Sequence, residues 1–159
     1  MTNRAPDWKS VPLAKPNYTP YWPLPSITPK FSKNSFGGGR PWGCEECERW
    51  HCGVDLINSG DAFVTVPEEC EVYKTDVGWS GQAKAIYLIS NNYFIVMGGI
   101  ENNSPQEYEI YNGSIVSPGD TIGVVNKGYG MIHFELYDKN VRKHSPWYVG
   151  NKPPKGLLN

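Results

Sequence analysis

The segment CEECERWHCGVDL, residues 44–56, combines a histidine, three cysteines and four acidic residues, which are the residue types that bind metals. On a strand, His51 and Asp55 point to one face, and Cys52 points to the other. Fully extended chain would separate His51 from Asp55 by about 13 Å, so both can reach one metal only if the strand bends, and Gly53 permits a bend or a close approach of another segment. His133, in GYGMIHFELYD, is the other histidine expected within a strand. His51, Asp55 and His133 therefore form a candidate zinc site, against the alternative that these histidines are simply packed or solvated.

Four cysteines, at positions 44, 47, 52 and 70, follow a C-x2-C-x4-C-x17-C pattern. Three interpretations compete. In the first interpretation, Cys52 and Cys70 are small apolar residues on the inner face of a sheet, with Cys52 directed away from His51 and Asp55. Alternatively, all four surround a second zinc or a [4Fe–4S] cluster. In the third interpretation, Cys44 or Cys47 is the fourth ligand of the first zinc and closes that site.

These residues must be positioned by a β-domain. From residue 51 onward, short apolar runs rich in Val, Ile, Tyr and Phe alternate with turn signals such as NN, NG, PGD and KGYG. No segment has a sustained helical period. The pattern predicts an all-β, mainly antiparallel fold with little helix, whose strands are CGVDLI, AFVTV, CEVYKTDV, AKAIYLI, YFIVMGGI, YEIYNGSIV, DTIGVV and MIHFELYD.

Residues 1–43 differ from the rest in composition. They hold eight of the 14 prolines and carry six Lys/Arg against one Asp, a balance of +5. Closely spaced prolines prevent long helices and remove strand donors, while the many aromatic residues argue against a purely disordered tail. We expect an extended arm and hinge at 1–43 that contacts partner subunits, a β-domain at 44–150, and a tail at 151–159.

The overall composition excludes some functions. The 159 residues are enough for one domain, and a net charge of −1 is not that of a protein that binds nucleic acid through phosphates. No apolar run is long enough for a transmembrane helix, and the first residues are not those of a signal peptide, so we expect no membrane insertion and synthesis in a reducing cytoplasm.

Two strand motifs, HCGVDL and MIHFEL, with SPGDTIGVV before the second, resemble the lysostaphin-type (LytM-like) peptidoglycan zinc metallo-endopeptidases. Their signature is H-x-G-x-D, then V-x-x-G-D-x-I-G, then H-x-H-F-E, and the resemblance covers about residues 49–138. It implies that His51, Asp55 and His133 hold the zinc, with a water as fourth ligand. Both catalytic histidines of the family are replaced, one by Met131 and the other by Gly98 or Gly99. Glu101 and Tyr129 are the nearest alternative acid or base, and His144 is expected to be a solvated surface residue.

The resemblance and the lost histidines lead to one main hypothesis. The chain is a structural component of a phage tail, baseplate or related contractile particle, built on a degenerate endopeptidase domain and located in the virion, where its arm binds other subunits. On this hypothesis the chain is made in the bacterial host cytoplasm and is not expected to be an enzyme. Two alternatives stay open. One is an active virion-associated peptidoglycan endopeptidase, and the other is a module that binds peptidoglycan or a partner without cutting.

Overall fold

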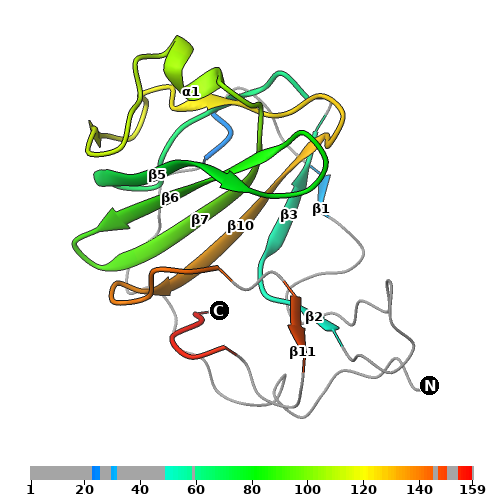
Figure 1. Ribbon diagram of the computed structural model, residues 1–159, viewed down its shortest axis with the longest axis vertical. Helices are drawn as coiled ribbons and strands as arrows, with labels where there is room; N and C mark the ends of the chain where they lie inside the picture. The colour runs from blue at the N-terminus through cyan, green and yellow to red at the C-terminus, as the bar shows by residue number, and fades with distance from the viewer. Residues whose placement is uncertain are drawn as a thin grey trace.

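The computed structural model describes residues 23–25, 30–31, 49–58, 60–144, 147–149 and 154–158. Within them, nearly all regular structure is antiparallel β-sheet and there is one short helix, which confirms the expected fold class (Figure 1). The elements are β1 (Lys30–Phe31), β2 (Arg49–His51), β3 (Val54–Ile57), β4 (Phe63–Val64), β5 (Cys70–Gly78), β6 (Lys84–Ser90), β7 (Tyr93–Ile100), α1 (Ser104–Glu107), β8 (Ile115–Val116), β9 (Gly123–Val124), β10 (Met131–Asp138) and β11 (Trp147–Val149).

A seven-stranded sheet of order β1-β3-β10-β7-β6-β5-β8 forms the centre of the domain. Strands β5, β6 and β7 follow one another as hairpins, whereas β10 lies between β3 and β7, as Figure 1 shows. Two smaller sheets pair β2 with β11 and β4 with β9. The position of β10 brings the two motifs of the sequence, about 80 residues apart, onto adjacent strands.

Strand β7 is buried along its whole length, so both faces of the sheet are covered. Its side chains alternate between two apolar clusters: Ile95 and Met97 belong to the larger one, and Phe94 and Val96 to the smaller one. Full burial of each such side chain stabilises the fold by about 1.5–3 kcal/mol. The candidate metal ligand His133 lies on the face of the smaller cluster, because its neighbours on β10 belong to the larger one.

Short pieces of the expected arm and tail pack against the β-domain. Leu24 is fully buried in the larger cluster, and β1 pairs with β3. Near the other end of the chain, Leu157 and Leu158 are buried and backbone hydrogen bonds join residues 156 and 158 to β10. These pieces belong to the folded domain, whereas most of residues 1–43 lies outside the described residues, so the domain boundaries remain predictions.

The prediction of a strand at residues 108–116 is wrong for most of that range. After α1 ends at Glu107, residues 108–114 form turns and irregular chain, and only β8 is extended. Asn103 and Glu109 on either side of α1 have φ of 64° and 58°, which interrupt any ladder, while Ile110 is buried from a turn. The apolar residues of this segment therefore indicate burial, not a strand. Among the described residues, no helix has the length and apolar character to cross a membrane.

Candidate metal centre

Two strands and a bend between them place the first two candidate ligands. His51 ends β2, the chain bends at Gly53, and Asp55 lies in β3 directly opposite His133 of β10. A Cβ atom on Gly53 would lie 2.5 Å from the Phe134 carbonyl oxygen and 2.6 Å from His133 Nε2. Glycine is therefore required for the close approach to β10, one of the two roles that the sequence indicated for it.

Three side-chain atoms converge at this point. His51 Nε2 lies 3.0 Å from Asp55 Oδ1 and 2.9 Å from His133 Nδ1, and His133 Nδ1 lies 2.8 Å from Asp55 Oδ1. The three residues are 1%, 5% and 3% exposed. They are the group that could hold a metal ion among the residues that the structure describes.

Hydrogen bonds alone do not satisfy this arrangement. With Asp55 ionised, its oxygen can accept from both imidazoles only if two N–H groups then face each other across 2.9 Å. If one nitrogen is deprotonated, its lone pair faces the carboxylate instead. A cation between the three atoms removes both conflicts, so the donor set fits a metal ion.

The spacing and chemistry of the donors also suit zinc. Imidazole nitrogen and carboxylate oxygen bind zinc at about 2.0–2.2 Å, so tetrahedral ligands are about 3.3 Å apart, a few tenths of an ångström more than the contacts here. Three protein ligands with one remaining position is the pattern of zinc sites that can accept a further ligand.

A chain of buried groups orients His133 from its other nitrogen. His133 Nε2–H donates to Glu135 Oε1 at 2.7 Å, and the Tyr137 hydroxyl donates to Glu135 Oε2 at 2.6 Å. Glu135 and Tyr137 are each 1% exposed. Because residues i, i+2 and i+4 of a strand share one face, β10 aligns all three. The bond to Glu135 keeps the proton on Nε2, which leaves the Nδ1 lone pair for a metal.

The pKa values agree with a paired charge cluster. Burial alone would raise the pKa of Asp55, but hydrogen bonds from His133 and His51 hold it far below its ordinary value. Burial likewise lowers the pKa of His133, yet the carboxylates of Asp55 and Glu135 raise it to about 9. In the metal-free protein, His133 is therefore protonated and Asp55 ionised at neutral pH.

The described cysteines do not form a common metal cluster. Cys70 lies in the larger apolar cluster and Cys52 in the smaller one, on opposite faces of the sheet. Burial and the carboxylates of Glu68 and Glu69 raise the pKa of the Cys70 thiol to about 12, which disfavours a thiolate ligand. The positions of Cys52 and Cys70 therefore do not favour a cluster of all four cysteines, which stays a prediction. Cys44 and Cys47 lie outside the described residues, so a fourth ligand from either remains a prediction.

Cys52 is buried, as expected, but its direction differs from the prediction. It joins the smaller cluster, on the same face of the sheet as the metal ligands, because the chain has left β2 before reaching it. Strand alternation applies only within a continuous strand, and the bend at Gly53 interrupts it.

The structure places the positions at which the resemblance implies replaced catalytic histidines. Gly98 pairs directly with His133, so a side chain at this position would project beside the metal ligands. Gly99 has φ of 102°, and a Cβ atom there would lie 2.2 Å from the Met131 carbonyl oxygen. Met131 precedes His133 by two residues on the same face of β10. Gly98 and Met131 are therefore the positions next to the centre.

Three further side chains predicted from sequence can now be placed. Glu101 accepts a hydrogen bond from the Asn126 side chain at 2.6 Å and is not part of the metal group. The Tyr129 ring lies against Gly99. His144 was expected to be solvated but is half-buried. Its Nδ1 atom is hydrogen-bonded to the Tyr87 hydroxyl, and its ring centre lies 4.9 Å from that of Trp79. Burial lowers its pKa, so it is neutral.

Sequence reasoning missed Glu135, Tyr137 and Trp79. The first two could have been found from the i, i+2, i+4 alternation in MIHFELY, once His133 was taken as a ligand. Trp79 lies in the turn between β5 and β6, and its ring is 5.2 Å from that of His133. No local pattern predicts that contact, which depends on how β6 and β7 are aligned.

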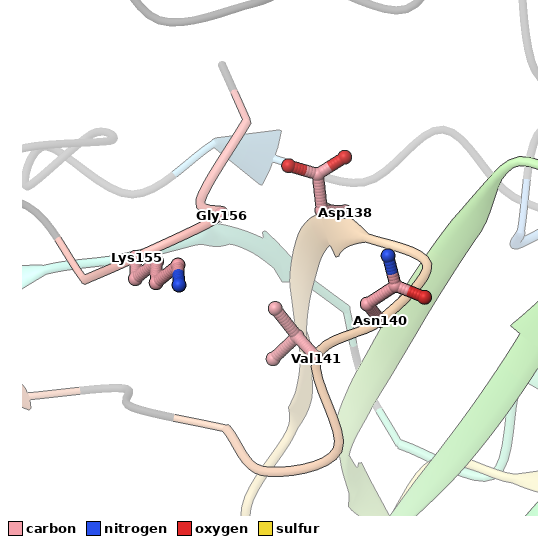
Figure 2. Close-up of a pocket in the computed structure, with 5 residues that line it drawn as sticks. All are labelled: Asp138, Asn140, Val141, Lys155 and Gly156. Carbon is pink, nitrogen blue, oxygen red and sulfur yellow. The ribbon is translucent and has the colours of Figure 1, made fainter.

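A separate pocket lies at the far end of β10 (Figure 2). Lys155 and Gly156 face Asp138, Asn140 and Val141 across it, where the 154–158 segment meets the end of the strand. None of the metal-centre residues lines this pocket. It is a groove between the C-terminal segment and the sheet, separate from the candidate chemistry.

Three solved structures are similar to this chain in fold. That of LytU has a TM-score of 0.54 and 14% identity, with 82% of this chain and 86% of that chain covered. That of CbpA from L. salivarius REN has a TM-score of 0.55 and 20% identity, with 82% and 91% covered. Csd3 of Helicobacter pylori has a TM-score of 0.50 and 20% identity, with 92% of this chain but only 37% of that chain covered.

These neighbours have the LytM-type peptidase fold, which is therefore the fold of this β-domain. No protein-family model matches the sequence, and no curated protein does.

Proposed function

We propose that this chain is a zinc-binding domain of LytM type, related to peptidoglycan metallo-endopeptidases, with little or no hydrolytic activity. The observation that carries the proposal is the convergence of His51, Asp55 and His133 on one point, in the same motifs that hold zinc in the family. The fold shared with LytU and CbpA supports it.

Zinc held by these ligands would supply Lewis acidity toward a peptide carbonyl and lower the pKa of a bound water. Hydrolysis also needs groups that move protons and stabilise developing charge, each contributing a factor of roughly 100–10,000. Methionine at 131 and glycine at 98 can do neither. The whole sequence has three histidines, and two are ligands, so only His144 remains.

Metal analysis tests the first half of the proposal. We expect about one equivalent of zinc in the purified protein, and loss of that zinc in His51→Ala, Asp55→Ala and His133→Ala. His144→Ala is the matched control, since it removes a half-buried histidine outside the ligand group. Zinc retained in all three ligand variants, or a brown iron-containing protein, would contradict the proposed centre.

Zymography against purified peptidoglycan tests the second half. The expected result is no clearing, or clearing far weaker than that of an active LytM-type enzyme at equal concentration. Clearing that a chelator abolishes and zinc restores would show instead an active endopeptidase. His144→Ala should then be compared, because His144 is the histidine that the ligand set leaves over.

Assembly into a phage tail, baseplate or similar particle remains our hypothesis for the biological role, with the virion as its location. It depends on residues 1–43, of which only 23–25 and 30–31 are described. Co-purification of particle proteins with the full chain, but not with a variant lacking residues 1–22, would support it. Equal recovery with both would count against a role for this arm.

A further inference from the structure

The row of paired residues that contains the metal ligands continues across the sheet with small side chains. Asp55 pairs with His133, His133 with Gly98, and Gly98 with Ala85. Directly paired residues of an antiparallel sheet project to the same face. Next to His133, therefore, the small side chains of Gly98 and Ala85 leave space above the sheet. We call these two residues the small-residue row.

Trp79 occupies the space above this row. A Cβ atom on Gly98 would lie only 2.1 Å from Trp79 Cε2, so the indole lies directly on the glycine. The indole ring also contacts His133, with ring centres 5.2 Å apart, and His144, at 4.9 Å. The space into which a side chain at position 98 would project is thus filled by the Trp79 indole, which belongs to the turn after β5.

The indole is retained by packing alone. Its Nε1 atom is buried and has no hydrogen-bond partner among the described residues. Gly78 and Gly81, on either side of Trp79 in the β5–β6 turn, have no atom within 4 Å of an added Cβ. A buried donor without an acceptor weakens the packed state, and no atoms pack against the turn at the two glycines beside Trp79.

From these contacts we propose that Trp79 determines access to the metal centre. Its indole occupies the space above the small-residue row, on the side of His133 that faces the middle of the sheet. This inference rests on the proposed zinc site. It adds a second reason for weak hydrolysis besides the missing histidines, because a substrate peptide cannot enter this side while the indole is in place.

The direct test uses the full chain loaded with Co²⁺, whose visible absorption reports ligands at the metal, and acetohydroxamate as a small chelating probe. We expect Trp79→Ala to bind the probe at least tenfold more tightly than the unchanged chain. Trp79→Leu serves the same purpose if the alanine variant does not fold. Tyr73→Ala is the control, because Tyr73 is an exposed aromatic residue of β5, the strand that precedes Trp79.

Equal probe affinity in the unchanged chain and the Trp79 variants would overturn the inference while leaving the metal site intact. Failure of the unchanged chain to bind Co²⁺ at all would overturn the proposed function, and this inference with it. An equal gain in Tyr73→Ala would also contradict a specific role of Trp79.

A second test needs no metal. Gly98→Ala should lower the Tm of the unchanged chain, because the added methyl group must displace the indole. In the Trp79→Ala background the same change should have a clearly smaller effect, since the space is already empty. An equal decrease in Tm in both backgrounds would show that Trp79 does not occupy this space and would overturn the inference.

Discussion

At the scale of single residues, His133 is held from both ring nitrogens. Nδ1 faces Asp55 and His51, while Nε2–H donates to Glu135, which in turn accepts from Tyr137. Such outer partners fix the tautomer and ring orientation of a metal ligand and increase its basicity. The quality of the site therefore depends on two residues that do not contact the metal position.

Removing these outer partners should weaken metal binding. We expect Glu135→Gln and Tyr137→Phe to lower zinc affinity by roughly 10–100-fold, with the larger effect for Glu135, because outer partners of ligating histidines typically have effects of this size. Competition with a coloured zinc chelator measures the affinity. Tyr87→Phe is the control, since Tyr87 is a buried tyrosine that bonds His144 and not Glu135. An affinity unchanged in Tyr137→Phe would contradict the chain of contacts.

Gly53 should tolerate no side chain. The Cβ atom of Gly53→Ala would meet the Phe134 carbonyl oxygen at 2.5 Å, so β3 must move away from β10. Overpacking of this kind costs about 1–3 kcal/mol in the free energy of unfolding, measurable by urea denaturation, and we expect loss of zinc as well. Gly78→Ala should change stability by less than about 0.5 kcal/mol, because nothing lies near its added methyl group. Similar losses in both variants would argue against this contact.

At the scale of elements, β10 is the strand on which the domain is built. It pairs with β7 along one edge, and along the other with β3 at residues 131–134. Beyond the end of β3, residues 156–158 take its place beside β10, through an Asp138 N–H bond to the Gly156 carbonyl and a Leu158 N–H bond to the Leu136 carbonyl, both 2.8 Å. The C-terminal segment is thus a continuation of the sheet edge.

A substitution in this segment should therefore destabilise the whole domain. Leu158→Ala removes a side chain that is 8% exposed in the larger cluster, and we expect a loss of about 2–4 kcal/mol in the free energy of unfolding. Ile115→Ala, at a residue 65% exposed, should have almost no effect. Chemical denaturation monitored by circular dichroism compares the two. A neutral Leu158→Ala would mean that the segment is a tail after all.

At the scale of the whole molecule, the sheet separates two environments. The larger cluster holds most of the buried aliphatic residues, and the smaller one shares its face with the charged metal centre. Burying ionisable groups costs free energy unless they are paired or bind a cation. The stability of the entire domain should therefore depend on pH and on metal.

For the metal-free protein, two groups determine how stability changes with pH: His133 and Asp55. The raised pKa of His133 gives stability that is fully present below pH 6.5 and is lost as the pH rises to about 9. The lowered pKa of Asp55 gives stability that is present above pH 4 and is lost in acid. Zinc needs a deprotonated Nδ1 and so binds more tightly as the pH rises.

We therefore expect zinc to raise the Tm more at pH 8 than at pH 6, because the metal-free form weakens over this range while zinc affinity increases. Differential scanning fluorimetry with and without zinc measures both Tm values. His133→Gln should show neither the pH-dependent loss in the metal-free form nor the zinc effect. A zinc-induced shift that is smaller at pH 8 than at pH 6 would contradict this assignment of charges.

The sequence by itself determined the fold class and the three candidate ligands. Short apolar runs bounded by turn signals identified β5, β6, β7 and β10 closely, because apolar runs and turn residues are local properties. The H-x-G-x-D and H-F-E motifs identified His51, Asp55 and His133 for the same reason: their spacing is fixed within short segments.

Only the tertiary structure decided which distant residues surround the ligands. Strand register placed Gly98 beside His133 and the Trp79 indole on top of Gly98, and it separated Cys52 from Cys70 by a whole sheet. Register results from pairing between strands far apart in the chain, and a shift of one residue would reverse every face. For that reason local sequence could name the candidate ligands but could not show which distant residues pack beside them.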